Sequence, residues 1–210
     1  MRLAVFGTGT VGQTLGVAFA GLGHEVVLGT RDPAATRARE GWSSDLPLEE
    51  YADAAAGAEV VVVAVSGGGA LDALAAGGDL TGKVVLDVSN PLDFSGGFPP
   101  TLSVSNTESL AEQLQAAHPE ARVVKSLNTL TAALMVAPTS LADGDHTIFV
   151  AGDDSEARAT VAGLLRELGW SDIVEFEALE AARGMEMWLP LWLRLMQSFG
   201  SANFNLKLVR

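Results

Sequence analysis

Three glycines near the start of the chain have the spacing with the clearest chemical meaning. Gly7, Gly9 and Gly12 form a Gly-x-Gly-x-x-Gly pattern directly after the apolar run 2–6, and residues 13–20 then show helical spacing. In a strand–turn–helix unit the first glycine permits the tight turn, the second lets the backbone approach a pyrophosphate, and the third lets the helix pack closely on the strand. Free N–H groups at the helix N-terminus also favour an anion. The pattern predicts a dinucleotide-binding loop made of Gly7, Thr8, Gly9, Thr10, Val11 and Gly12.

The end of the second apolar run, 25–29, bears on the choice between NAD and NADP. An acidic residue about twenty positions beyond the glycine motif binds the ribose 2′-hydroxyl of NAD. Here the run is followed by Thr30, Arg31, Asp32 and Pro33. Arg31 can pair with a 2′-phosphate and the Thr30 hydroxyl can donate to it, whereas Asp32-Pro33 is typical of a helix start. The order favours NADP; Asp32 turned toward the ribose would favour NAD, and a solvated surface position is the alternative for Arg31.

The chain has few residues for acid–base or nucleophilic catalysis. It has no cysteine, its three histidines show no ligand spacing, and its only tyrosine, Tyr51, is followed four residues later by Ala55 rather than by lysine. None of its three lysines lies on a predicted central helix, so the residue patterns of short-chain and hydroxyacid dehydrogenases are both missing. We therefore expect no metal site. Hydride transfer between two planar cofactors needs mainly stacking and a correct distance, so it tolerates such a composition.

Candidate residues for a second ring lie after the fifth strand and near the C-terminus. Asn128 and Thr129 can hydrogen-bond a carboxamide or a ring edge, although both residue types are also common in turns. Near the C-terminus, the small residues Gly200, Ser201 and Ala202 follow a helix rich in Met, Trp and Leu, and they would let a ring approach the backbone. For the large side chains of that helix, core or dimer packing is the more ordinary interpretation. Arg183 either pairs with Glu186 at i, i+3 or meets an anionic tail of a second ligand.

Apolar runs that alternate with helical patterns predict an α/β fold, a doubly wound parallel sheet of the Rossmann type with a small C-terminal helical lobe. Right-handed crossovers would bring the carboxyl end of every strand to one edge of the sheet, with residues 7–12, 30–31, 66–67 and 89–91. We expect residues 1–178 to form the dinucleotide-binding domain and residues 179–210 to complete the second-ring pocket. The expected strands are 2–6, 25–29, 59–65, 83–88, 122–126, 146–151 and 172–176; the expected helices are 13–20, 33–40, 48–56, 70–76, 107–117, 129–136, 155–168 and 179–199, with a loop at 89–105.

Composition limits the partners. The chain has 210 residues, 48% of them hydrophobic, and a formal net charge of −13, which argues against nucleic acid as a partner. The most apolar stretch, 185–199, is interrupted by charged residues and proline and is too short to span a bilayer. We expect a cytoplasmic protein whose partners are small-molecule redox cofactors. The apolar surface of the last helix predicts a homodimer.

Residues 7–12, 23–31, 124–129, 183–186 and 195–207 together resemble the family of NADP oxidoreductases that depend on the deazaflavin coenzyme F420. The same fold resembles the cytosolic reductase domain of metalloreductases, which pass hydride from NADPH to a flavin. The resemblance implies NADP(H) as cofactor and coenzyme F420 or a flavin as hydride partner. A reductase of a small organic substrate and a non-catalytic NADP-binding redox sensor remain as alternatives. By the same resemblance Thr8–Val11 hold the pyrophosphate and Thr30 and Arg31 the 2′-phosphate, while the ribose and nicotinamide are flanked by Val65, Ser66, Gly67, Asn90 and Pro91 and closed in by Gly200, Ser201 and Ala202.

Overall fold

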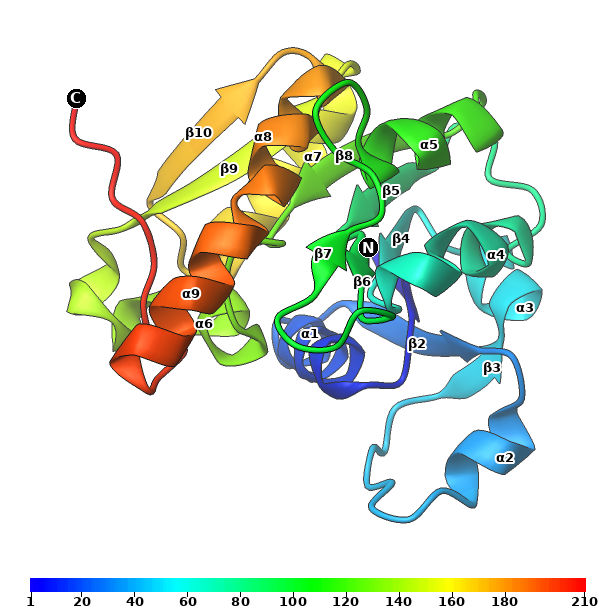
Figure 1. Ribbon diagram of the computed structural model, residues 1–210. Coiled ribbons are helices and arrows are strands. Elements are labelled where there is room, and N and C mark those ends of the chain that lie inside the picture. Colours follow the sequence, from blue (N-terminus) through cyan, green and yellow to red (C-terminus); the bar gives the residue numbers. More distant parts are fainter.

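A computed structural model describes all residues, 1–210, and has an eight-stranded sheet at its centre (Figure 1). The strand order is β10-β9-β8-β5-β4-β1-β2-β3, so the chain winds outward from β1 in both directions, as in a Rossmann fold. This confirms the predicted doubly wound α/β class. The strands are β1 Arg2–Phe6, β2 Glu25–Thr30, β3 Leu48–Glu50, β4 Val60–Val63, β5 Val84–Asp87, β8 Arg122–Ser126, β9 Thr147–Gly152 and β10 Asp172–Phe176, with β6 Leu92–Asp93 and β7 Thr101–Leu102 in a separate hairpin.

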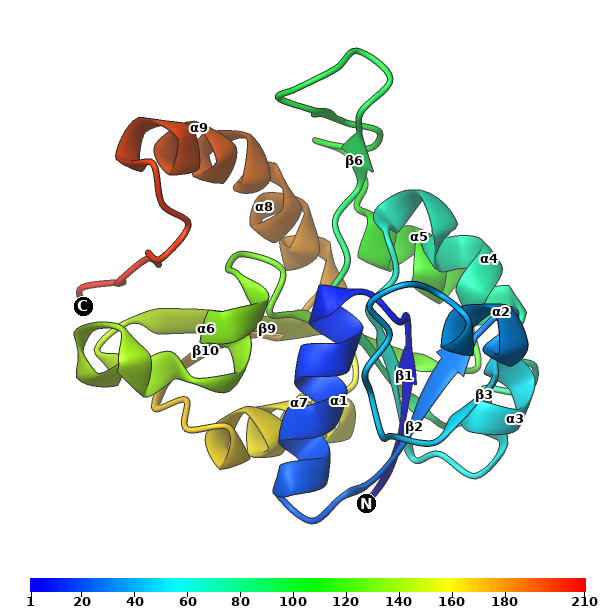
Figure 2. The same cartoon turned by 90° about the horizontal axis from the view of Figure 1, so that it is seen from below.

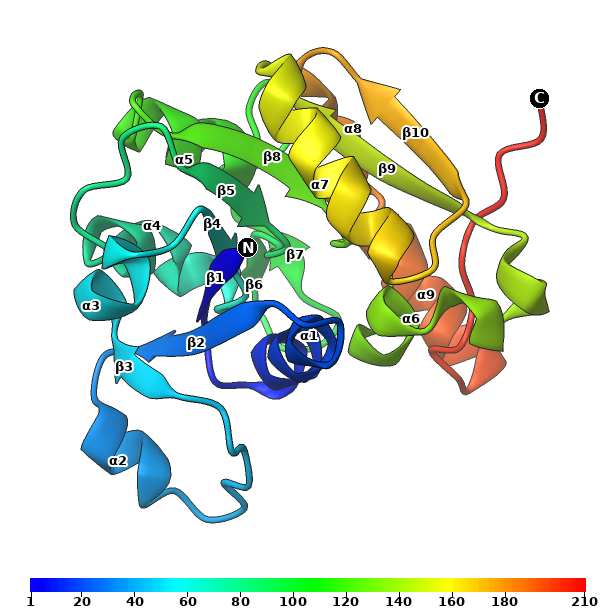
Figure 3. The ribbon, with the colours of Figure 1, turned by 180° about the vertical axis from the view of Figure 1, so that it is seen from behind.

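Helices cover both faces of the sheet, and each face has its own apolar core. Figure 3 shows α1, α6 and α7 on one face, where Leu15 and Val161 pack with inward-facing strand residues such as Val62. Helices α3, α4 and α5 cover the other face with a core that includes Phe6 and Leu74. The α-helices are α1 Thr10–Gly21, α2 Pro33–Arg37, α3 Tyr51–Ala56, α4 Ala70–Ala75, α5 Leu110–Ala117, α6 Ala132–Val136, α7 Ser155–Glu167, α8 Ala182–Met187 and α9 Leu189–Phe199. No helix is both long and apolar enough to cross a membrane.

Burial on both faces explains the continuous apolar strands. All four residues of β4 are valines and all are buried, as expected of a parallel strand between two layers of helices. The prediction of a single helix at 48–56 is wrong at its start: residues 48–50 form the edge strand β3, which pairs with β2 through Leu28 and Leu48. The helix begins only at Tyr51. The predicted loop at 89–105 contains the β6–β7 hairpin.

The expectation that every strand runs in the same direction is wrong for β9 and β10. Strand β9 pairs antiparallel with β8, and β10 pairs parallel with β9, so these two strands run opposite to the other six. The chain between β8 and β9 carries the short helix α6, which packs on α1, and it does not cross back along the sheet. Strand β9 therefore starts at the edge where β8 ends. The loops after β1, β2, β4 and β5 still meet at one edge because these strands are mutually parallel.

The last segment is not the single helix predicted over 179–199. A 3₁₀ turn at Leu179–Ala181 leads into α8, and α9 starts anew at Leu189 with Pro190 in its first turn. Proline lacks an N–H and its ring opposes the carbonyl four residues earlier, which interrupts the helix. In Figure 2 the β6–β7 hairpin and α9 both rise above the edge at which β1 ends. The tail then returns to the start of β9, where the Thr147 N–H donates to the Leu206 carbonyl at 2.8 Å.

Candidate functional site

A cavity of about 600 Å³ opens at the carboxyl edge of the parallel strands. This volume lies within the usual range for small-molecule sites, roughly 300–1,000 Å³. The loops after β1, β2 and β4 and the first turns of α3 and α4 form it. Its lining residues are Gly7, Thr8, Gly9, Thr30, Arg31, Tyr51, Ala64, Val65, Ser66, Gly68, Gly69, Asp72, Ala73 and Ala76.

The glycine loop has the geometry that its three glycines predict. Gly7 has a φ of +125°, and a Cβ there would lie 2.6 Å from the Ala64 carbonyl oxygen. A Cβ on Gly12 would overlap the Gly7 carbonyl, because α1 packs directly against the turn. At Gly9, by contrast, no atom of the chain lies within 4 Å of the Cβ position. The fold itself therefore requires glycine at positions 7 and 12, whereas at Gly9, which lines the cavity, it leaves the space open.

Helix α1 starts at Thr10, and the cap residue Gly9 has no side chain to bond its first N–H groups. The first turn also contains no acidic residue. Such an uncapped N-terminus leaves N–H donors and the positive end of the helix dipole facing the cavity. Val11 is half-buried, packs against the apolar core and does not line the cavity.

Arg31 is an exposed cavity residue with no hydrogen bond or ion pair inside the chain. Asp32 is the N-cap of α2: its carboxylate accepts from the Ala35 N–H at 2.8 Å, which confirms the predicted cap, and Asp32 does not line the cavity. Thr30 is nearly buried and its hydroxyl lies 2.9 Å from that of Thr36. A lone guanidinium in a chain of net charge −13 is available to an anionic ligand.

Sequence reasoning missed two residues here: Tyr51, which lines the cavity, and Arg39, which contacts its glycine loop. Tyr51 lines the cavity, and burial raises the pKa of its phenol although nearby Arg31 acts to lower it. Arg39 reaches back to the glycine loop, where its guanidinium donates to the Thr8 carbonyl at 2.6 Å and stacks 5.6 Å from the Trp42 ring centroid. Neither residue belongs to a short motif, since each contact depends on how α2 and α3 fold over the loop.

Asn90 and Asn128 lie beyond the Ser66–Gly67 turn. A Cβ on Gly67 would overlap the Asn90 carbonyl, so the loops after β4 and β5 touch there. The Asn90 side chain donates to the Asn128 carbonyl at 2.9 Å, and the Asn128 side chain donates to Asn90 Oδ1 at 3.0 Å and to the Met185 carbonyl at 3.0 Å. Asn128 is buried behind half-buried Asn90, and its own Oδ1 has no partner.

A buried charged cluster adjoins these amides. The Lys125 ammonium lies 2.7 Å from each of Asp87 Oδ2, Glu186 Oε1 and the Ser89 carbonyl, and its side chain is fully buried. Burial alone would lower the pKa of Lys125, but the two carboxylates raise it, so the lysine is protonated. Burial raises the pKa of Glu186 despite the neighbouring ammonium. The sequence signal for the Asp87–Lys125 pair is a charged residue of opposite sign near the end of each of two apolar strands. No comparable signal in the sequence points to Glu186.

A second, smaller pocket of about 230 Å³ lies between β9, β10, α8 and the C-terminal tail. Its lining is mostly apolar and includes Thr129, and the half-buried Trp188 in its wall has an indole N–H without a partner. Met185, whose carbonyl holds Asn128, also lines it. Asn128 and Met185 therefore lie between the two pockets.

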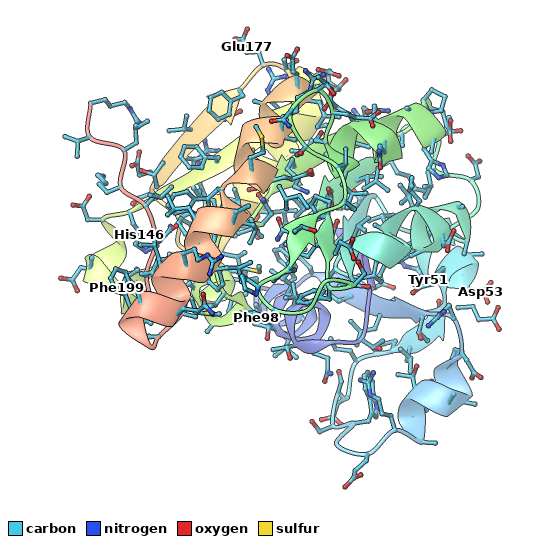
Figure 4. All side chains as sticks on the ribbon, in the orientation of Figure 1. Tyr51, Asp53, Phe98, His146, Glu177 and Phe199 are labelled. Carbon is cyan, nitrogen blue, oxygen red and sulfur yellow. The ribbon has the colours of Figure 1, made fainter.

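The structure does not bring every predicted residue to the main cavity. Gly200, Ser201 and Ala202 are absent from both pocket linings; Gly200 has a φ of 63° and ends α9 in the left-handed conformation. Figure 4 shows the neighbouring Phe199 far across the molecule from Tyr51. The predicted pairing of Arg183 with Glu186 is wrong. Arg183 pairs with Glu112 and Glu180 on the surface, because Glu186 points inward to Lys125.

Comparison with known proteins gives the same class at the level of sequence and fold. Residues 2–91 match the family model described as NADP oxidoreductase, coenzyme F420-dependent. The F420-dependent NADP reductase of Methanothermobacter thermautotrophicus is 30% identical over 208 residues, covering 93% of this chain and 89% of that protein. A crystal structure from Arthrobacter sp. FB24, itself a proposed F420-dependent NADP reductase, is 52% identical, covers 100% of both chains and superposes with a TM-score of 0.97.

The metalloreductase STEAP3 of Rattus norvegicus is 29% identical over 199 residues, which is 94% of this chain but 38% of that protein. The chain thus spans well under half the length of its metalloreductase relatives.

The strand order and the glycine-lined cavity define a Rossmann-type α/β protein with an opening where this fold binds dinucleotides. More particularly, the chain belongs to the family of coenzyme F420-dependent NADP oxidoreductases.

Proposed function

We propose that this protein is an NADPH-dependent oxidoreductase that transfers hydride between NADP(H) and a deazaflavin, coenzyme F420, or a flavin. The observation that carries the proposal is the unpartnered guanidinium of Arg31, which lines one cavity together with the open backbone at Gly9. The pyrophosphate proposed at the glycine loop is common to dinucleotide cofactors, and the 2′-phosphate proposed at Arg31 is the anionic group that distinguishes NADP from NAD.

In this proposal residues 7–12 hold the pyrophosphate through backbone N–H groups. Arg31 and the Thr30 hydroxyl hold the 2′-phosphate, while Val65, Ser66 and Gly67 flank the ribose. Asn90 has used one of its two side-chain N–H groups and one lone pair, so it retains one donor and one acceptor for the nicotinamide carboxamide. Pro91 fixes the backbone beside it, and buried Asn128 supports it from behind.

The hydride partner would bind on the side of Thr129 and α8. The small pocket there is apolar and is lined by Thr129 and Trp188, whose buried indole N–H has no partner in the chain and would reach a ring edge once the pocket widens. When bound, the two cofactors supply the redox chemistry: hydride leaves NADPH for the acceptor ring, which takes up one proton from water. Because the pocket is smaller than usual sites, we propose that residues 179–210, including the tail at Leu206, adjust to complete it.

A reaction of this kind requires little from the protein beyond position. No histidine or lysine lines either pocket, and the Lys125 ammonium has all three donors engaged. The Tyr51 phenol lies near Arg31, on the side proposed for the 2′-phosphate rather than for the nicotinamide. A reductase of a small organic substrate would need a proton donor beside the nicotinamide, so the lining favours a cofactor as the acceptor.

The test is NADPH oxidation by the purified protein with coenzyme F420, FMN or FAD as acceptor, followed by absorbance. Rapid bleaching of one of them identifies the partner. Oxidation only with an added carbonyl or imine compound would favour the small-substrate alternative. NADPH binding without oxidation by any acceptor would favour the redox sensor.

We also propose a homodimer formed through α9. Most residues of α9 are apolar, and two of them, Leu191 and Phe199, are exposed, with 52% and 61% of their surface accessible. A second copy would remove this surface from water.

A further inference from the structure

The Asp87–Lys125–Glu186 cluster has no part in the contacts proposed above for NADPH. Lys125 lines neither pocket, and its three partners use all the donors of its ammonium group. The cluster is therefore unable to donate a proton or a hydrogen bond to a ligand in this arrangement. We therefore consider which structural elements the cluster connects.

The cluster joins four segments that are distant in sequence. Asp87 ends β5, Lys125 lies near the end of β8, and Glu186 belongs to α8. The Glu186 carboxylate also accepts from the N–H groups of Leu110, at 2.9 Å, and Ala111, at 3.3 Å, in the first turn of α5. One side chain thus ties α8 to the sheet and to α5.

The backbone next to Glu186 bears on the candidate nicotinamide site. The carbonyl of Met185 accepts the Asn128 side-chain N–H at 3.0 Å, and the same amide group donates to Asn90 Oδ1 at 3.0 Å. A shift of α8 would move the Met185 carbonyl, and Asn128 would lose one of the two bonds that orient it. Asn90 would then lose the donor to its Oδ1 and keep only its own bond to the Asn128 carbonyl.

We propose that Glu186 is a positioning residue that holds α8 so that Met185 and Asn128 orient the Asn90 amide toward the nicotinamide. The proposal rests on the proposed function, since it requires a nicotinamide beside Asn90. In this proposal the cluster has a role in positioning α8 in addition to any contribution to the stability of the fold. Replacing a buried ion cluster by apolar residues is often neutral or stabilising, whereas the directional bonds of Glu186 specify one position of α8.

The charges of the cluster indicate which variants keep the fold. Two carboxylates surround one ammonium, so removing Glu186 leaves the neutral pair Asp87–Lys125 rather than an unpaired charge. Glu186→Ala removes the link to Lys125 and the link to α5. Glu186→Gln keeps the volume, and its oxygen in the Oε1 position still accepts from Lys125 and the Ala111 N–H. Its NH₂ group would face the Leu110 N–H, so the link to α5 is kept only in part. The matched control is Glu180→Gln, an exposed carboxylate bound only to Arg183 nearby.

The experiment compares two ligands, NADPH and 2′,5′-ADP, which has the adenosine and 2′-phosphate but no nicotinamide. Calorimetry gives both Kd values, and the change in NADPH fluorescence on binding reports on the nicotinamide. For Glu186→Ala we expect an unchanged Kd for 2′,5′-ADP, a Kd for NADPH raised about tenfold and a reduced fluorescence change. Glu186→Gln should be intermediate, and Glu180→Gln should equal the wild type.

Equal weakening of both ligands in Glu186→Ala would mean general loosening and would overturn the proposal, as would unchanged NADPH binding. If the Ala variant fails to fold, Glu186→Gln and Asn128→Asp decide. Asn128→Asp removes both side-chain donors without touching the cluster and should give the same selective loss. If the wild-type protein binds NADPH no more tightly than 2′,5′-ADP, and NADPH fluorescence does not change on binding, this inference alone is overturned. A wild-type protein that binds neither ligand overturns the proposed function as well.

Discussion

Asn90 and Asn128 exchange hydrogen bonds across the ends of β5 and β8: each side-chain amide donates to the other residue, at 2.9 and 3.0 Å. The two residues are 38 positions apart, yet together they form one rigid polar unit at the carboxyl edge of the sheet. Asn128 is buried and Asn90 is half-buried, so Asn90 is the member that a ligand can reach. In the proposed function Asn90 therefore contacts the ligand, and Asn128 supports Asn90.

Asn90→Ala should slow hydride transfer more than it weakens NADPH binding overall. The adenosine and phosphate contacts lie elsewhere, whereas the orientation of the nicotinamide would depend on Asn90. Misplacement of a reacting group by about 1 Å costs roughly 100-fold in rate. Single-turnover kinetics with the identified acceptor measures the loss, and a rate equal to wild type would contradict the assignment of Asn90.

Gly9→Ala and Gly12→Ala should have opposite effects. Gly9 has a φ of −81°, which alanine accepts, and space around its Cβ position, so the variant should fold normally. Its NADPH affinity should fall at least about tenfold because the methyl group occupies pyrophosphate space. Gly12→Ala should lose roughly 3 kcal/mol of unfolding free energy by overlap with the Gly7 carbonyl. Denaturant unfolding and NADPH titration of both variants check this contrast; equal behaviour would refute it.

Arg31→Ala should reduce the preference for NADPH over NADH. Loss of charge-assisted hydrogen bonds of about 1.5–3 kcal/mol predicts a Kd for NADPH raised roughly 10- to 100-fold, with NADH binding nearly unchanged. Arg37→Ala is the control, because Arg37 donates to the Leu48 carbonyl and does not line the cavity. If both arginine variants affect NADPH equally, the effect is general electrostatics rather than a phosphate contact.

Acid should release the C-terminal tail before the sheet unfolds. The Thr147 hydroxyl, together with Lys207 and Arg210, lowers the pKa of Asp172 below its usual range. A carboxyl with a lowered pKa stabilises the native contacts above its unfolded pKa of about 3.9, and this contribution is lost as the pH falls through the lower folded-state pKa. Hydrogen exchange of residues 203–210, corrected for intrinsic rates, should therefore accelerate below about pH 4. In Asp172→Asn the tail should exchange fast at every pH.

Light scattering after size exclusion should give a dimer at micromolar concentration, and Leu191→Glu should convert it to a monomer. The substitution introduces a charge into the exposed apolar surface of α9 without touching the core. Leu71→Glu, at an exposed leucine on α4, is the matched control for the added negative charge. A monomeric wild-type protein would refute the dimer.

Much of the fold is local and can be predicted from residue order. The apolar run at Val60–Val63 and the glycines at 7–12 carry their own geometry, since strand burial and a tight turn each depend on neighbours in sequence. Arg31 could be assigned as well, because the position of the second strand relative to the glycine motif is constant in this fold.

Only the tertiary structure decided the rest. The reversal of β9 depends on how α6 packs on α1, and the contact of Arg39 with Thr8 depends on how the chain after α2 folds over the glycine loop. Glu186 looked like a surface partner for Arg183 at helical spacing, but it pairs with Lys125, 61 positions away. Side chains that meet across such distances satisfy buried charge in three dimensions, and no periodicity in the chain records which partner they take.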